Sequence, residues 1–204
     1  MKRRIYIVLF SVLFILFLTL YLTNNINILD EFFYNLIISL KSSFVTSFML
    51  FITYLASTKF IIIVMIIFLC KYFISKKRLY LITDIIILGE VVINNVLKLV
   101  IGRKRPILIN LVAETSYSFP SGHTMVAVVL YGFLIYIINK SKINKYLKIT
   151  INGLLIILII LIMMSRIYLG AHYASDVFAG MSLSIAYLLI VIELLERRKL
   201  VWKH

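Results

Sequence analysis

The chain has 204 residues, of which 63% are hydrophobic and 15% are charged, and its mean hydropathy is +1.06. A soluble domain of this size could not bury so much apolar surface, so the composition excludes that class and indicates a protein that crosses a membrane several times. The formal net charge of +14 would be compatible with binding to nucleic acid, so the positions of the charges along the chain must be considered. Cys70 is the single cysteine, which excludes an internal disulfide.

The chain opens with a short basic stretch followed by an apolar run over residues 5–22. No small-residue cleavage site follows this run, so we interpret it as an uncleaved first span and not as a signal peptide. Residues 24–43 are more polar, and their large apolar residues recur at helical spacing: Phe32, Phe33, Leu36, Ile37 and Leu40. This pattern predicts an amphipathic helix that lies at the membrane interface.

The remaining apolar runs predict five more spans. Residues 44–74 are too long for one straight span and too short for two, so we expect a short interfacial segment and then a span at about 59–74. The later spans are expected at about residues 79–99, 124–138, 147–164 and 177–195. The expected fold is an all-α bundle of six transmembrane helices with one interfacial helix, in which residues 1–204 form a single domain.

Basic residues between the apolar runs predict the orientation of the bundle. With the N-terminus inside, the cytoplasmic segments hold 15 of the 22 basic residues: Lys2, Arg3, Arg4, Lys71, Lys76, Lys77, Arg78, Lys140, Lys142, Lys145, Lys148, Arg197, Arg198, Lys199 and Lys203. Every loop then obeys the positive-inside rule, so both termini are predicted to be cytoplasmic. Membrane topology therefore accounts for most of the positive charge, which argues against a surface that binds nucleic acid.

Five of the seven other basic residues lie on the outer side, within residues 98–105 or at 166. The two prolines and two of the three histidines lie beside them, at Pro106, Pro120, His123 and His172, whereas His204 lies in the tail. The positive-inside rule explains basic residues in cytoplasmic loops but not in outer loops. We therefore expect these segments to bind an anion.

Three short motifs cover these segments. Residues 98–106 read K-x6-R-P, residues 120–123 read P-S-G-H, and residues 165–176 read S-R-x5-H-x3-D. In this order they resemble the three signature motifs of the type 2 phosphatidic acid phosphatase (PAP2) superfamily, and the six-span plan is similar to that of the family. The resemblance covers the membrane core from the third span to the sixth, and it implies a metal-independent phosphatase that needs no cofactor.

The cationic residues of these motifs suit a phosphoryl group. Charge on its equatorial oxygens calls for fixed positive donors, and Lys98, Arg105 and Arg166 can supply a point charge and two planar forks. Arg103 and Lys104 are expected on a solvated loop face instead.

The P-S-G-H motif directly precedes the fourth predicted span. Ser121 is expected to be the N-cap of that helix, whose free N–H groups would then form an anion site. Gly122 would permit close approach of the backbone to the phosphate. A capping role alone remains an alternative for Ser121.

His172 and Asp176 are four residues apart at the entry to the sixth span, so they share one helical face. A carboxylate there can accept a hydrogen bond from one ring nitrogen and leave the other free to attack phosphorus, which favours His172 over His123 as the nucleophile. The resemblance implies that His172 forms a phospho-histidine and that Asp176 orients it. It also implies that His123 protonates the departing oxygen and then activates water.

Two acidic residues inside the third span, Asp84 and Glu90, are costly in lipid and should face the bundle interior. Glu90, Asn94 and Lys98 share one helical face. They suggest a polar chain that supports Lys98, and a structural role independent of Lys98 is the alternative.

The resemblance implies a lipid substrate whose headgroup faces outward from a bacterial cytoplasmic membrane. Undecaprenyl pyrophosphate and phosphatidylglycerol phosphate are the leading candidates, followed by phosphatidic acid and diacylglycerol pyrophosphate. A lipid phosphotransferase that uses the same histidine is one alternative. A non-enzymatic transporter of anionic lipids is another, although it gives no reason for His172 and Asp176.

Overall fold

The computed structural model describes residues 2–106, 111–112 and 114–199, and the regular secondary structure of this part is all helical. The helices are α1 (Lys2–Leu22), α2 (Asn27–Ile38), α3 (Ser43–Tyr54), α4 (Thr58–Ser75), α5 (Arg78–Ile101), α6 (Gly122–Lys140), α7 (Lys145–Tyr168) and α8 (Ala174–Arg197). Each predicted span has a counterpart among them. His204 lies outside the described residues.

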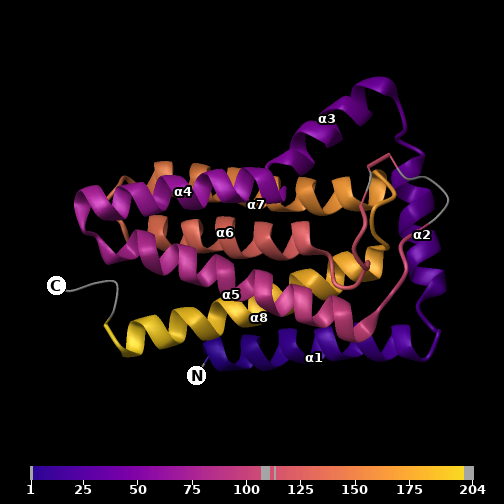
Figure 1. Cartoon of the computed structure of the whole chain (residues 1–204), viewed down its shortest axis with the longest axis horizontal. Coiled ribbons are helices and arrows are strands. Elements are labelled where there is room, and N and C mark those ends of the chain that lie inside the picture. Colours follow the sequence, from indigo (N-terminus) through magenta and orange to yellow (C-terminus); the bar gives the residue numbers. More distant parts are fainter. Residues whose placement is uncertain (1, 107–110, 113, 200–204) are drawn as a thin grey trace.

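The long helices run side by side along the length of the molecule, whereas α2 lies across one end and α3 leans away from the bundle (Figure 1). Within the described ranges, five stretches are long and apolar enough to cross a membrane: Lys2–Leu22, Ser43–Ser75, Gly122–Lys140, Lys145–Tyr168 and Ala174–Arg197. The prediction of an all-helical protein that crosses a membrane several times is confirmed. Helix α5 also runs within the bundle, packed against α4 and α6.

The apolar run at residues 44–74 is divided at Ser57. The Ser57 side chain accepts a hydrogen bond from the backbone N–H of Phe60 (3.3 Å) and caps the start of α4. At the end of α3, Tyr131 Oη donates to the carbonyl of Leu55 (2.7 Å), which satisfies one of the acceptors that a helix end leaves open. The break allows α4 to follow the bundle while α3 turns aside.

Helix α6 lies at the centre and packs against α5, α7 and α8. It is apolar on all sides, as a helix surrounded by other helices should be. Ala127, Val129 and Phe133 have no exposed surface. This close packing fixes the N-terminal end of α6, which carries the P-S-G-H motif.

Antiparallel neighbours bring four helix ends together beside α2: the C-terminal ends of α5 and α7 and the N-terminal ends of α6 and α8 (Figure 1). The opposite end joins the first turn of α1 to the last turn of α8, through an ion pair between Arg3 and Glu196 (2.8 Å). Lys140 contacts the same carboxylate at 3.0 Å. The motif residues therefore lie at one end of the bundle and the two ends of the described chain at the other.

Candidate active site

All eight residues that the sequence predicted for the site lie at the end of the bundle beside α2: Lys98, Arg105, Ser121, Gly122, His123, Arg166, His172 and Asp176. Helices α5 to α8 each contribute at least one of them, as do the loop between α5 and α6 and the loop between α7 and α8. Because each side chain is attached at or next to the end of a packed helix, the site is held by the core of the bundle.

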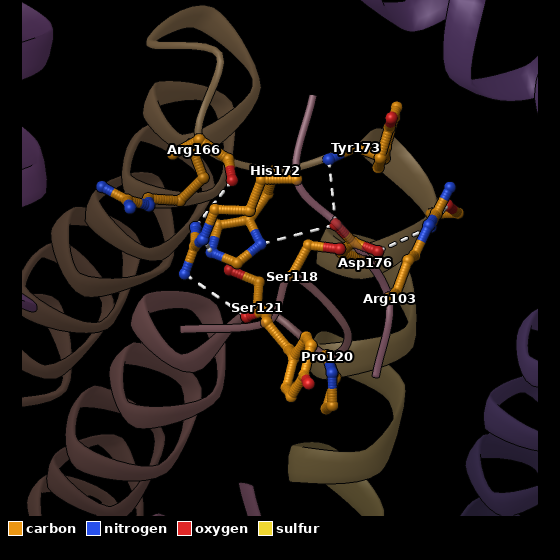
Figure 2. Close-up of polar contacts among 12 residues, drawn as sticks. Arg103, Ser118, Pro120, Ser121, Arg166, His172, Tyr173 and Asp176 are labelled. Carbon is orange, nitrogen blue, oxygen red and sulfur yellow. Dashed lines mark hydrogen bonds and ion pairs between the residues drawn. The ribbon is translucent and has the colours of Figure 1, made fainter. Parts of the chain in front are cut away.

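His172 and Asp176 approach each other as predicted, but at a long distance. His172 Nδ1 lies 3.4 Å from Asp176 Oδ2, and it has no hydrogen-bond partner within the described residues. The backbone N–H of Tyr173 donates to the same carboxylate oxygen (3.0 Å), and Figure 2 shows the carboxylate between His172 and Arg103. Long contacts of this kind are common in active sites without substrate.

The imidazole of His172 is neutral at physiological pH. Burial lowers its pKa well below the ordinary value, and Arg166, Arg105 and Lys98 lower it further. Arg105 Nη1 lies 3.2 Å from His172 Nε2. With the ring proton on Nδ1, facing Asp176, the lone pair of Nε2 points into the cationic part of the site.

Arg166 contributes through both its side chain and its backbone. Its side chain is 1% exposed; Nη1 donates to Thr53 Oγ1 (2.6 Å) and Nη2 to Glu114 Oε1 (2.5 Å). Its carbonyl oxygen accepts the N–H groups of Ala171 and His172, each at 3.1 Å. The end of α7 therefore fixes the main chain that carries the imidazole.

Glu114 is a residue of the site that sequence reasoning missed. Besides Arg166, its carboxylate lies 3.6 Å from Arg105 Nη2 and 4.0 Å from His123 Nδ1. It occupies the position between two guanidinium groups and a histidine that would suit a phosphate. The signal that could have found it is an isolated acidic residue in an outer loop between two basic motifs.

Lys98 and Arg105 are both tied to the loop that precedes α6. Lys98 Nζ donates to the carbonyl of Tyr117 (2.5 Å) and to Ser116 Oγ (3.4 Å). Arg105 Nε donates to the carbonyl of Ser116 (2.6 Å). These contacts hold two of the predicted phosphate-binding cations in place and leave one N–H of the ammonium group for a ligand.

The polar chain suggested for Glu90, Asn94 and Lys98 does not form. Asn94 donates to the carbonyl of Pro120 (3.2 Å) and contacts the sulfur of Met125 (3.1 Å), and both carboxyl oxygens of Glu90 lack a hydrogen-bond partner within the described residues. Asn94 therefore fastens α5 to the P-S-G-H turn, independently of Lys98.

Ser121 occupies the N-cap position of α6, but its side chain makes no capping hydrogen bond. Its hydroxyl instead accepts from Thr124 Oγ1 (3.0 Å), and its N–H donates to the carbonyl of Asp176 (3.1 Å). The predicted N-cap position of Ser121 is therefore right, but the predicted capping hydrogen bond of its side chain is absent. A Cβ on Gly122 would lie 3.0 Å from Asn94 Oδ1, so the absence of a side chain permits close packing against α5.

Arg103 is buried, so its expected place on a solvated loop face is wrong. Its guanidinium donates to Asp176 Oδ1 (2.6 Å) and to Asp30 Oδ2 (2.7 Å). It also lies over the rings of Tyr21 and Tyr173, 4.7 and 4.0 Å from their centroids. Two carboxylates and two aromatic faces replace the water that the cation would bind on a surface.

A cavity of about 480 Å³ joins the histidines to a groove between α4 and α5. Polar and charged residues line one part: Asn95, Lys98, Arg105, Glu114, Ser116, His123 and His172. The rest is mostly apolar, lined by Ile61, Ile62, Met65, Leu88, Val91 and Val126, with the polar side chains of Thr58, Glu90 and Asn94 among them. The cavity thus suits a ligand with an anionic end and an apolar chain.

Three cationic side chains, those of Lys98, Arg105 and Arg166, are gathered at the end of the bundle beside α2, as the motifs predict. A phosphoryl group would need positive donors of this kind. Within the described parts of the chain, no three His, Cys, Asp or Glu residues come together in a way that could hold a metal ion.

Residues 79–200 match the PAP2 superfamily, and this chain belongs to that family. A similar protein is phosphatidylglycerophosphatase B of Bacillus subtilis (strain 168), which is 31% identical over 175 residues. This match covers 83% of the chain and 84% of the relative. The family predicted from the three motifs is confirmed.

Two solved structures are similar to the whole bundle. A transmembrane PAP2-type phosphatidylglycerolphosphate phosphatase from Bacillus subtilis has a TM-score of 0.85 and 27% identity, with 94% of this chain and 96% of that chain covered. LpxE from Aquifex aeolicus has a TM-score of 0.62 and 25% identity, with 78% and 92% covered. The fold is therefore that of membrane-embedded PAP2 proteins.

Proposed function

We propose that this protein is a membrane lipid phosphatase that hydrolyses a phosphomonoester or a pyrophosphate through a phospho-histidine intermediate. The observation that carries the proposal is the neutral, buried imidazole of His172, which has Arg105 3.2 Å from Nε2 and Asp176 3.4 Å from Nδ1. Membership of the PAP2 superfamily and the similarity to a Bacillus subtilis phosphatase in sequence and in structure support it.

Substrate binding replaces one anion by another. Lys98, Arg105 and Arg166 hold the phosphate oxygens, aided by the N-terminal turn of α6 with Ser121 and Gly122. The carboxylate of Glu114, which now lies against Arg105 and Arg166, gives way to the phosphate.

His172 Nε2 then attacks phosphorus, and the bond from phosphorus to the leaving oxygen breaks. His123 donates a proton to that oxygen, while Asp176 stabilises the positive charge that forms on the His172 ring. In the second half, His123 accepts a proton from a water molecule whose oxygen attacks phosphorus. The bond from phosphorus to Nε2 breaks, and inorganic phosphate leaves.

The cavity favours a lipid over a soluble phosphate ester. Its apolar part is lined by Ile61 and Met65 of α4 and by Leu88 and Val91 of α5, and it is continuous with the part that contains the histidines. An acyl or prenyl chain in this groove would place the phosphate at His172.

Phosphatidylglycerol phosphate is the substrate we place first, because the Bacillus subtilis relative and the similar Bacillus subtilis structure both carry that activity in their names. Undecaprenyl pyrophosphate is second, since the site binds the phosphate and the apolar groove accepts either kind of chain. A phosphotransferase would use the same His172 intermediate with a lipid acceptor in place of water.

The membrane arrangement belongs to the same proposal. We count α5 as a span beside the five apolar stretches, which gives six, and we assign α2, which lies across one end of the bundle (Figure 1), to the membrane interface. The distribution of Lys and Arg supports an orientation in a bacterial cytoplasmic membrane with both termini in the cytoplasm and the active site on the outer face.

Purified protein in detergent, with EDTA present, would be assayed for phosphate release from a panel of the four candidate lipids. We expect wild-type release and none from His172→Ala, whereas His204→Ala serves as a matched histidine control with wild-type activity. Full activity of His172→Ala would contradict the mechanism, and a requirement for added Mg²⁺ would contradict its metal independence. Products formed with and without a lipid alcohol as acceptor distinguish hydrolysis from transfer.

A further inference from the structure

Asp30 lies outside the three motifs, and Arg103 occupies an unspecified position of the first, yet both are connected to the carboxylate that faces the nucleophile. We propose that Asp30 is a positioning residue for catalysis, which acts through Arg103 on Asp176 and thereby on His172. This inference rests on the proposed function, because it takes His172 as the nucleophile.

All hydrogen bonds of the Asp30 side chain go to Arg103 or to the first turn of α8. Oδ2 accepts from Arg103 Nη2 (2.7 Å) and from Ser175 Oγ (2.9 Å), and Oδ1 accepts from the backbone N–H of Ser175 (2.8 Å). Asp30 is 5% exposed. A carboxylate from an interfacial helix is therefore directed inward, toward the residues next to Asp176.

Arg103 is fixed in a position from which it reaches both carboxylates. Nη1 donates to Asp176 Oδ1 (2.6 Å) and to Ser175 Oγ (2.7 Å). The ring stacking with Tyr21 and Tyr173 prevents the guanidinium from turning. One planar cation thus joins Asp30 to Asp176, and only a fork with two nitrogens can make both contacts.

The two carboxylates share a single positive charge, and all three side chains are largely buried. Asp176 is completely buried, so its interaction with Arg103 is strong. If Asp30 loses its charge, Arg103 attracts Asp176 alone and draws its carboxylate away from Nδ1 of His172. The distance of 3.4 Å between His172 Nδ1 and Asp176 Oδ2 must shorten as the ring becomes cationic during phosphoryl transfer. Loss of the Asp30 charge should therefore lower the rate of the chemical step.

Asp30→Asn tests this inference, with Glu31→Gln as the matched control on an exposed neighbour in the same helix. We expect Asp30→Asn to lower kcat on the order of 10- to 100-fold, the size expected for loss of a charged partner, while KM changes less than about threefold. Asp30→Glu restores the charge and should recover much of kcat. An unchanged kcat in Asp30→Asn, or a loss that appears only in KM, would overturn the proposal.

A double-mutant cycle shows whether Asp30 acts through Arg103. Once Arg103→Gln has been introduced, adding Asp30→Asn should lower kcat by less than about threefold further, because the connection is already broken. Lys104→Gln, next in sequence and exposed, is the control and should keep wild-type kcat. If the fold-loss of kcat in the double variant equals the product of the losses in the two single variants, Asp30 acts by a route other than Arg103.

Two further variants keep the proposal testable where Asp30→Asn does not fold. Arg103→Lys retains the charge but lacks the planar fork, so kcat should fall at least about tenfold while the melting temperature stays near wild type. Ser175→Ala removes a hydroxyl that contacts both Asp30 and Arg103 and should keep kcat within about threefold. Wild-type kcat in Arg103→Lys, or equal losses in both variants, would show that only structural bracing is involved.

His172→Ala in the same assay separates this inference from the proposed function. If His172→Ala is active, the proposed function fails. If His172→Ala is inactive and Asp30→Asn has wild-type kcat, the function stands and the role of Asp30 fails.

Discussion

The ionisable residues at the end of the bundle beside α2 determine one another's charge. Burial and three neighbouring cations lower the pKa of His172, and burial lowers the pKa of Arg105. Burial alone would lower the pKa of Arg103 as well, but Asp176 and Asp30 raise it overall. A neutral nucleophile can therefore lie beside permanent positive charge, which is the combination that attack on a phosphate dianion requires.

The pKa of His172 predicts the acid side of the pH profile. Because the folded-state pKa lies below the ordinary value of 6.5, the imidazole stays neutral as pH falls through 6.5 and gains its proton only further down. The kcat/KM profile is first corrected for the second ionisation of the substrate phosphate, at about pH 6. The midpoint of its acid limb should then lie below pH 6.5. A corrected limb at or above pH 6.5 would contradict this.

Glu114 predicts the response to inorganic phosphate. Its carboxylate competes with phosphate for Arg105 and Arg166, so Glu114→Gln should lower the inhibition constant of phosphate by about 3- to 10-fold. The measurement is inhibition of lipid hydrolysis by added phosphate, with Glu31→Gln as the control. An unchanged or higher inhibition constant would mean that Glu114 does not occupy the phosphate position.

At the scale of helices, the sequence predicts a helix boundary well where a glycine or charged residues interrupt an apolar run. Gly102 takes a left-handed conformation (φ 66°) and ends α5, and charged residues bound the later spans. The break between α3 and α4 has no glycine or proline, and Ser57 was its only local signal. The predicted division of residues 44–74 into a short segment and a helix from about residue 59 agrees with α3 and α4, whereas the direction in which α3 leaves the bundle (Figure 1) has no signal in the sequence.

Close helix contact at Gly180 predicts a loss of stability on substitution. A Cβ there would lie 3.1 Å from the backbone oxygen of Ser121 and 3.2 Å from the side chain of Met125, so Gly180→Ala must push α8 from α6. We expect a cost of about 1–3 kcal/mol and a lower kcat.

Gly153→Ala is the matched control, since a Cβ on Gly153 meets nothing within 4 Å. It should leave activity unchanged and raise stability by about 0.5–1 kcal/mol through helix propensity. Thermal unfolding in detergent compares the two variants. Equal melting temperatures would contradict the close packing of α8 on α6.

At the scale of the whole molecule, the motifs predict the site, and long-range contacts complete it. The motif spacing brought His172 and Asp176 to one place because both belong to a single local turn. Asp30 and Arg103 are 73 residues apart, and no local pattern predicts that pairing. Sequence reasoning treated Arg103 as a loop charge because its partners are determined only by the packing of α2 against α8.

The predicted orientation can be checked by cysteine labelling in a Cys70→Ser background. Thr115→Cys lies in the loop before α6 and Lys142→Cys in the loop after it. A membrane-impermeant maleimide should label Thr115→Cys in intact cells and Lys142→Cys only after permeabilisation, because the positive-inside rule predicts that the Lys-rich loop is cytoplasmic. The reverse pattern would contradict an outward-facing site.

Trapping the intermediate tests the central claim most directly. Wild-type protein mixed with lipid labelled in its terminal phosphate and quenched in alkali should carry label on a nitrogen of His172, released by acid. His172→Ala should carry none and release no phosphate. Label on another residue, or phosphate release by His172→Ala at the wild-type rate, would contradict the account.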